Sequence, residues 1–268
     1  MASFDFDQAE GLRRMLAGPK PRIVTFLSAT PQDDKGAMLV NLGASLAQSG
    51  NDVMIVDACT RDYGVAQRLG VDRGPGLLQV ARQECALNQV IHAVPQGFSV
   101  ATLARTPVSS ADEARRLAKT FDVLVKQSGS IIMVDGEFSE DGTFPVPIMA
   151  SSEIVVQVST SATSITNAYA LIKRLSQHLG RRPFGILVTG ATEAEAKVVY
   201  DNMSSAATRY LAVTLSSMGS VPADEYLHRA ARLGRAVVDA FPLAGASVAF
   251  RRLAGRFART GMQQGRAA

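Results

Sequence analysis

Short runs of apolar and β-branched residues recur along this chain and alternate with longer segments of helical periodicity. Several of these runs, such as the one from Ile131 to Val134, are apolar at every position. A strand with one solvated face alternates polar and apolar side chains, so a continuously apolar strand belongs to a sheet that is covered on both faces. The pattern predicts a three-layer, doubly wound α/β fold in which crossover helices flank a mostly parallel sheet.

The predicted elements cover most of the chain. About seven strands are predicted, at residues 22–28, 52–57, 98–103, 130–135, 153–159, 184–189 and 213–221. Helices are predicted at residues 36–49, 111–126, 164–179, 193–210 and 223–239. The 268 residues and 47% apolar composition suffice for one large domain. That domain is predicted at residues 21–245, between an N-terminal helix and tether (1–20) and a C-terminal amphipathic helix and tail (246–268).

Composition excludes several classes of protein. No stretch approaches the roughly 18 uninterrupted apolar residues of a membrane-spanning helix, and the N-terminus carries acidic residues where a secretory signal carries basic ones. We therefore expect a cytoplasmic protein. The cysteines and histidines show no zinc-ligand spacing, which predicts structural roles for Cys59, Cys85, His92, His178 and His228.

Positive charge gathers near the C-terminus. From Arg229 onward the chain has eight arginines and one acidic residue, Asp239, a net charge of +7 against +4 for the whole chain, so the preceding residues carry about −3. A basic tail on a slightly acidic body favours an anionic partner surface, either a membrane or nucleic acid, and disfavours general coating of nucleic acid.

A basic amphipathic helix is predicted at residues 246–259. Its apolar side carries Phe250, Leu253 and Phe257, and its basic side carries Arg251, Arg252 and Arg256. Such a helix favours peripheral association with anionic lipids on the inner face of the membrane. In the alternative, the apolar side docks on the body and the arginines are merely solvated.

The loop after the first predicted strand occupies the position of a P-loop, Gly-x-x-x-x-Gly-Lys-Ser/Thr, which cradles the phosphates of a nucleotide. Here the eight positions are Ala29, Thr30, Pro31, Gln32, Asp33, Asp34, Lys35 and Gly36. Of the residues that define the motif, Lys35 alone is kept.

Each replacement in this loop opposes nucleotide binding. Pro31 has no N–H to donate to a phosphate, and Gly36 offers no hydroxyl to Mg²⁺. Asp33 and Asp34 would each repel a phosphate charge by about 3 kcal/mol at a separation of about 6 Å and an effective dielectric constant near 20. The loop is therefore predicted not to bind Mg-ATP. In the alternative, the acids point outward, Lys35 contacts a phosphate, and weak ATP binding persists.

Three segments carry a resemblance to a known family. Residues 41–47 followed by residues 53–58, Asn-Leu-Gly-Ala-Ser-Leu-Ala and Val-Met-Ile-Val-Asp-Ala, resemble the corresponding run of the MinD/ParA superfamily. Residues 164–173 resemble a helix of its flagellar branch, and residues 7–13, Asp-Gln-Ala-Glu-Gly-Leu-Arg, are similar to the N-terminal helix of FlhG (FleN) proteins. The resemblance implies a P-loop NTPase fold and a role in controlling flagellar number or placement.

The resemblance also implies partners. In FlhG proteins the N-terminal helix binds and stimulates the SRP-type GTPase FlhF, which would place Asp7, Gln8, Leu12 and Arg13 at that interface, with Gln8 directed toward the GTP. Flagellar basal-body components, inner-membrane lipids and a second copy of the chain are further implied partners, and no specific nucleic acid is. The alternative is an ordinary solvated helix.

The chain departs from the family pattern at the catalytic positions. Asp57 matches the first acid after the second strand, but Cys59 replaces the second acid, which the family uses around the attacking water. Asp135 matches the Walker B aspartate that supports Mg²⁺, and Thr30 replaces the lysine that reaches the partner's nucleotide. Because these changes occur together, the sequence favours a pseudo-ATPase scaffold. Lys35 could then simply neutralise one of the nearby acids.

Two other functions remain open at this stage. The chain could be a working ATPase that cycles between monomer and ATP-bound dimer, which would need Mg-ATP at the altered loop. It could also be a ParA-like partition protein that binds DNA nonspecifically through its basic surface.

Overall fold

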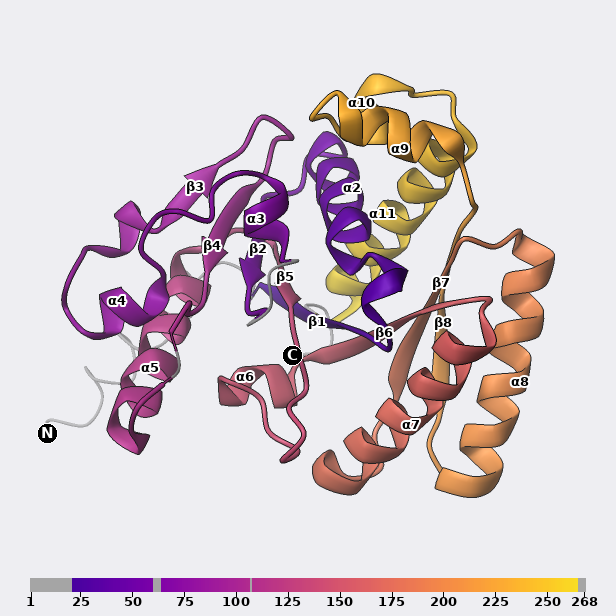
Figure 1. Ribbon diagram of the computed structural model, residues 1–268, viewed down its shortest axis with the longest axis horizontal. Coiled ribbons are helices and arrows are strands. Elements are labelled where there is room, and N and C mark those ends of the chain that lie inside the picture. The colour runs from indigo at the N-terminus through magenta and orange to yellow at the C-terminus, as the bar shows by residue number, and fades with distance from the viewer. Residues whose placement is uncertain (1–20, 60–63, 107, 265–268) are drawn as a thin grey trace, which may run out of the picture.

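The computed structural model describes residues 21–59, 64–106 and 108–264, and Figure 1 shows their arrangement. A sheet of eight strands runs through the centre in the order β3-β4-β2-β5-β1-β6-β7-β8. The strands are β1 (Arg22–Ser28), β2 (Val53–Asp57), β3 (Ile91–Ala93), β4 (Ser99–Thr102), β5 (Ile131–Asp135), β6 (Glu153–Ser159), β7 (Phe184–Thr189) and β8 (Leu215–Val221). All neighbouring strands are parallel except β3, which pairs antiparallel with β4. The predicted fold class is confirmed.

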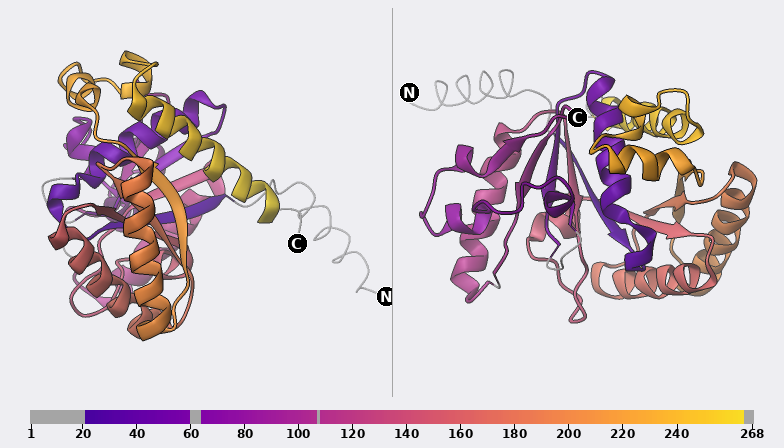
Figure 2. Two further views of the ribbon diagram at one scale, coloured as in Figure 1. Left: turned by 90° about the vertical axis from the view of Figure 1, so that its right-hand side faces the viewer. Right: turned by 45° about the horizontal axis from the view of Figure 1, so that its top comes forward.

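Helices cover both faces of this sheet. Their bounds are α2 (Lys35–Gln48), α3 (Val65–Arg68), α4 (Leu77–Ala81), α5 (Ala111–Gln127), α6 (Pro147–Ser151), α7 (Ala162–Leu179), α8 (Glu193–Leu211), α9 (Glu225–Arg232), α10 (Val237–Ala240) and α11 (Gly245–Gln264), with short 3₁₀ turns η1 (Pro31–Asp33) and η2 (Leu87–Gln89). One apolar cluster joins α2 and α11 to one face of the sheet. Two others join α4 and α5, and α7 and α8, to the opposite face. Figure 2 shows α11 alongside α2 from two further directions.

The central strands alternate their side chains between the two layers. In β5, Ile131 and Met133 pack with α2 and α11, whereas Ile132 and Val134 pack with α5. Every residue of β2 and β5 is buried. This double coverage is why these strands read as continuous apolar runs.

The structure differs from the predicted elements at the edge of the sheet and near the C-terminus, and it adds the short helices α3, α4 and α6. The eighth strand, β3, was not predicted, because it is three residues long, partly exposed and lies at the edge of the sheet, so its sequence has no apolar run. The helix predicted at residues 223–239 is interrupted between α9 and α10, where Gly234 adopts φ 64°. That left-handed conformation suits glycine and ends the helix.

The apolar side of the C-terminal helix α11 packs into the core of the α/β body. Phe250, Leu253 and Phe257 are each no more than 2% exposed. The Phe257 ring centroid lies 5.8 Å from that of Phe26, and the Arg22 guanidinium stacks 4.8 Å above the Phe257 ring. The apolar residues predicted to face a membrane therefore face α2 and the sheet, as in the docking alternative.

Other predictions concern the basic side of α11, membrane spanning and the N-terminal residues. Arg251, Arg252 and Arg256 are exposed on the outer side of α11. No helix among the described residues is long and apolar enough to cross a bilayer. The predicted partner-binding residues Asp7, Gln8, Leu12 and Arg13 lie outside the described residues.

Because α11 completes the core, Phe257→Ala should lower the free energy of unfolding by about 3–5 kcal/mol, the usual range for a fully buried phenylalanine. Val248→Ala, on the same helix but 38% exposed, is the matched control and should cost less than about 1 kcal/mol. Urea denaturation followed by circular dichroism measures both. Equal, small effects would mean that α11 does not stabilise the folded body.

Candidate functional site

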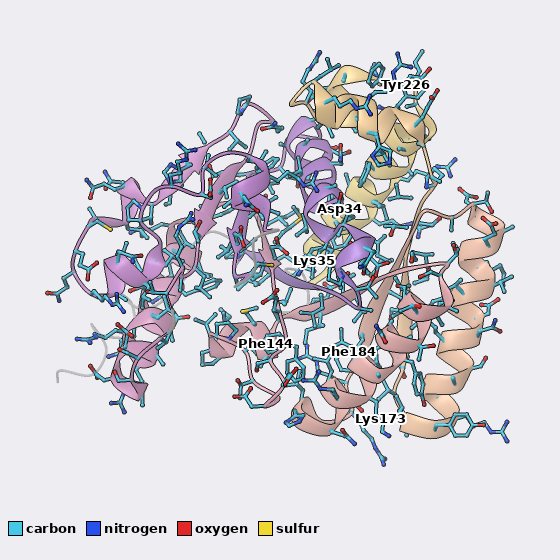
Figure 3. All side chains as sticks on the ribbon, viewed as in Figure 1. Asp34, Lys35, Phe144, Lys173, Phe184 and Tyr226 are labelled. Atoms are coloured by element: carbon cyan, nitrogen blue, oxygen red, sulfur yellow. The ribbon has the colours of Figure 1, made fainter. Side chains whose placement is uncertain are left out.

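An open cleft lies where the central strands end. Its volume is about 1190 Å³, and its walls come from the β1–α2 loop, α3, the loop after β5 and one side of α7. Asp57 and Asp135 are register partners at the carboxyl ends of β2 and β5, and β1 ends beside them. In open α/β sheets, ligands bind outside the carboxyl ends of the strands. The cleft is therefore the candidate site, and Asp34 and Lys35, which are labelled in Figure 3, belong to its lining.

Lys35 is held beneath this cleft by groups of the protein itself. Its Nζ lies 2.8 Å from Asp135 Oδ1, and it donates hydrogen bonds to the carbonyl oxygens of Phe26 and Gly136. The two paired side chains are 10% and 1% exposed. Burial alone would lower the pKa of Lys35, but the Asp135 carboxylate and other nearby acidic groups outweigh it and the pKa is raised. Lys35 thus neutralises Asp135, one of the roles considered from the sequence.

The loop before Lys35 forms the 3₁₀ turn η1 instead of an open cradle. The N–H groups of Asp33 and Asp34 donate to the carbonyl oxygens of Thr30 and Pro31, at 3.3 and 3.2 Å. A phosphate cradle needs such N–H groups directed at the ligand. In this loop they are committed to the turn.

Asp34 occupies the N-terminus of α2. It adopts φ 47° and ψ 58°, a left-handed conformation that aspartate tolerates better than most residues, and its Oδ1 accepts a hydrogen bond from the Ala37 N–H at 3.2 Å. The same oxygen pairs with Arg68 Nη2 of α3 at 2.5 Å. A carboxylate and its arginine thus stand at the helix end where a P-loop protein holds a phosphate.

Asp33 does not face the cleft, which corrects the expectation that it would repel a phosphate there. It is 8% exposed, and its Oδ2 accepts hydrogen bonds from Ser164 Oγ at 2.9 Å and Ser28 Oγ at 3.4 Å. The Asp33 backbone carbonyl also accepts a hydrogen bond from the buried Gln157 side chain. These bonds fix η1 to the start of α7 and to β6.

The two predicted catalytic acids hold the start of α3. Asp57 Oδ2 accepts from the Ala66 N–H at 2.8 Å, and Asp135 Oδ2 accepts from the Val65 N–H at 3.1 Å. A Cβ at Gly64 would lie 2.2 Å from Asp57 Oδ2, so the close approach of α3 depends on that glycine. Both carboxylates therefore have structural partners in the folded chain.

Burial also sets the protonation of this cluster. Burial and the neighbouring Asp135 carboxylate raise the pKa of Asp57 to about 6, against the opposing effect of the N–H groups of Ala66 and Cys59. Burial raises the pKa of the Cys59 thiol, although Lys35 acts in the opposite direction. The thiol is therefore protonated at neutral pH and is neither a nucleophile nor a replacement for the missing acid.

Mg-ATP does not fit this arrangement in the way that the family uses it. Asp57, Cys59 and Asp135 offer ligand atoms within 4.8 Å of one another, but the thiol is protonated and Asp135 is neutralised by Lys35. Gly36 supplies no hydroxyl, and Asp34 places negative charge at the end of α2. The residues that the sequence singled out are brought together, but their charges are satisfied by one another.

Comparison with known proteins adds to this geometry. No family model matches the chain. Antiactivator FleN of Pseudomonas aeruginosa is 30% identical over 227 residues, which cover 80% of this chain and 78% of that protein. The chain belongs to the FleN family. The family resemblance proposed from the sequence is confirmed at this level.

Solved structures related to this FleN-family chain show its fold alone. The cell division ATPase MinD of Pyrococcus furiosus superposes with a TM-score of 0.66 at 18% identity, over 89% of this chain and 99% of that one. A plasmid partition protein of Borrelia burgdorferi, solved with AMPPNP, superposes with a TM-score of 0.66 at 14% identity, over 90% and 100% of the two chains. Both agree with a MinD/ParA-type fold.

Several residues of the cleft were not predicted from the sequence. Arg68 reaches it from α3, whereas Asn167 and Arg174 line it from α7. The Arg174 guanidinium lies 5.5 Å above the Phe138 ring and donates to the Ser139 carbonyl. Residues 164–173 carried only a family resemblance, and no local pattern marks Arg68.

The raised pKa of Asp57 predicts a pH dependence of stability. Between pH 4 and pH 6 the folded chain keeps a proton that the unfolded chain has lost, so this group lowers the free energy of unfolding as pH rises, by up to about 3 kcal/mol in total. Asp57→Asn removes that dependence. The free energy of unfolding of the variant, relative to that of the wild type, should therefore rise between pH 4 and pH 7.

Urea titrations at several pH values measure this gain. Asparagine keeps one acceptor oxygen, so Asp57→Asn loses at most one of the hydrogen bonds from the N–H groups of Ala66 and Cys59. This loss does not titrate, so it offsets the curve without changing its slope. Asp122→Asn, on the exposed side of α5, is the control for losing one aspartate. Parallel curves for Asp57→Asn and wild type would contradict the prediction.

Proposed function

We propose that the chain is a FleN-type regulator of flagellar number or placement that works as a pseudo-ATPase scaffold, without hydrolysing ATP. The observation that carries this proposal is the pairing of two loop charges within the chain, Lys35 with Asp135 and Asp34 with Arg68. A nucleotide would have to displace a carboxylate from the N-terminus of α2 and separate a buried ion pair, which costs several kcal/mol.

The proposed action of the scaffold is stimulation of an SRP-type, FlhF-like GTPase. Support comes from the match of residues 7–13 to the N-terminal helix of FlhG proteins and from the identity to FleN. In this proposal Gln8 acts at the partner's GTP, Leu12 packs on the partner, and Asp7 and Arg13 contact its rim. Basal-body proteins are further proposed partners.

In this proposal, the membrane is contacted by basic side chains of α11 and not by its apolar side. Phe250, Leu253 and Phe257 are buried, so among the described side chains of α11 the basic ones that can meet anionic lipids are Arg251, Arg252 and Arg256. Each basic residue near such a surface contributes about 1 kcal/mol, so three of them bind weakly.

A second candidate is the ATP-dependent dimer. The size of the cleft, about 1190 Å³, favours it, because that volume accommodates a nucleotide, and the Borrelia burgdorferi neighbour was solved with AMPPNP. Partition-type DNA binding has no comparable observation in its favour.

Isothermal titration with ATP and with ADP, each with Mg²⁺, separates the two candidates. The wild type should give no binding heat at a protein concentration of about 100 μM, because Asp34 repels phosphate and the loop N–H groups are occupied. Micromolar binding that is lost in Lys35→Ala would contradict the scaffold proposal and favour the dimer. Since Lys35→Ala leaves Asp135 buried without its cation, its folding is checked first by thermal unfolding.

Gln8→Ala should abolish stimulation of GTP hydrolysis by an FlhF-like GTPase and leave the melting temperature unchanged, because in this proposal the side chain acts on the partner. Single-turnover GTP hydrolysis with purified partner measures the effect. Glu10→Ala, in the same segment but outside the proposed contact set, is the control. Full stimulation by Gln8→Ala would refute the partner assignment.

A further inference from the structure

Strand β8 forms one edge of the sheet, and a groove runs along it. Among the described strands, β8 has a single neighbour, β7. Ser216 and Ser217 are exposed, and the following residues through Ser220 are half-buried. The groove has a volume of about 880 Å³. Small side chains along an edge strand leave its backbone groups accessible for pairing.

Two helices form the walls of this groove, one on each face of the sheet. Helix α8 packs with the cluster on one face and α11 with the cluster on the other. The α8 wall is small and apolar at Ala196, whereas the α11 wall combines Val248 and Leu253 with Arg252 and Arg256. A segment lying along β8 would therefore meet different chemistry on alternate side chains.

Two backbone carbonyl groups of β8 already accept hydrogen bonds from side chains of the flanking helices. Tyr200 Oη donates to the Leu215 carbonyl at 2.8 Å, and Arg256 Nη1 lies 3.4 Å from the Met218 carbonyl. A bulge follows at Met218 and Gly219, where φ is 119°. A bulge of this kind prevents long, flat edge-to-edge pairing but leaves room for a short strand.

The ion pairs at the groove are exposed to solvent and therefore weak. Arg252 pairs with Glu193 across its mouth, and Lys197 pairs with Asp201 along α8. All four side chains are at least half exposed, and such pairs contribute little. A carboxylate from a partner can therefore replace Glu193 as the ligand of Arg252.

We propose that this groove binds a short, extended acidic peptide segment of a partner protein, which adds to β8 as a further strand. Backbone hydrogen bonds would come from the β8 edge, with acidic side chains directed at Arg252 and Arg256 of α11 and small apolar side chains directed at α8. The inference is independent of the nucleotide cleft, which lies at the ends of the central strands.

A second copy of the chain fits the groove less well. Antiparallel pairing of two β8 edges needs a two-fold axis perpendicular to the sheet, which sets each helix beside its own copy. The α11 arginines of one copy would then face those of the other, and like charges oppose association. An acidic segment meets no such repulsion.

The test uses fluorescein-labelled peptides of about nine residues, one alternating valine with glutamate and the other alternating valine with lysine, in anisotropy titrations with the full chain. The valine–glutamate peptide should bind and the valine–lysine peptide should not. Ser217→Pro removes a donor from the exposed edge and should weaken binding about tenfold or more.

A charge-reversal variant tests the same groove independently, in case the proline variant misfolds. Arg252→Glu, at a side chain 65% exposed, should weaken the valine–glutamate peptide about tenfold. It should also improve binding of the valine–lysine peptide. Arg115→Glu, at a side chain of α5 that is 73% exposed, is the matched control and should change neither peptide.

Three results would overturn the proposal. The first is no binding of the valine–glutamate peptide at about 1 mM protein. The second is binding that neither Ser217→Pro nor Arg252→Glu weakens, which would locate the peptide elsewhere. The third is a dimer, seen by sedimentation and lost in Ser217→Pro, which would make a second copy the occupant.

Discussion

The buried ion pair between Lys35 and Asp135 organises the ends of the three central strands. Lys35 begins α2 and Asp135 ends β5, so the pair joins the first crossover helix to the middle of the sheet. Removing either partner would leave an uncompensated charge in a buried site, which is far more costly than removing both. The other Asp135 oxygen holds the start of α3, so this one carboxylate positions two helices.

The same pair gives the lysine at the P-loop position a partner within the chain. In a nucleotide-binding loop, a lysine and the N-terminus of a helix bind the negatively charged phosphates of the nucleotide. Here Asp135 supplies negative charge to Lys35, and Asp34 supplies it to the N-terminus of α2 and to Arg68. Lys35, Arg68 and the N-terminus of α2 thereby have partners of opposite charge within the chain itself.

The position of α11 shows how amphipathicity serves packing. Its apolar side fills the space between α2 and the sheet, and the backbone carbonyl of Phe257 accepts a hydrogen bond from the buried Arg22. Its arginines lie on the outer side, where they border the β8 groove. A single helix thereby completes the core with one face and provides a charged surface with the other.

The sequence by itself determined the fold class and the chemistry of the altered loop. Strands covered on both faces must be apolar throughout, and proline or a missing hydroxyl changes a loop whatever surrounds it. The approximate strand and helix positions followed from the same periodicity.

Only the tertiary structure decided which way Asp33 turns, that Asp34 meets Arg68, and that Phe257 packs on Phe26. These contacts join residues far apart in the chain or reverse the direction of a single side chain. Hydrophobic periodicity gives which side of a helix is apolar, but whether that side meets the core or a membrane depends on the space left by the rest of the fold.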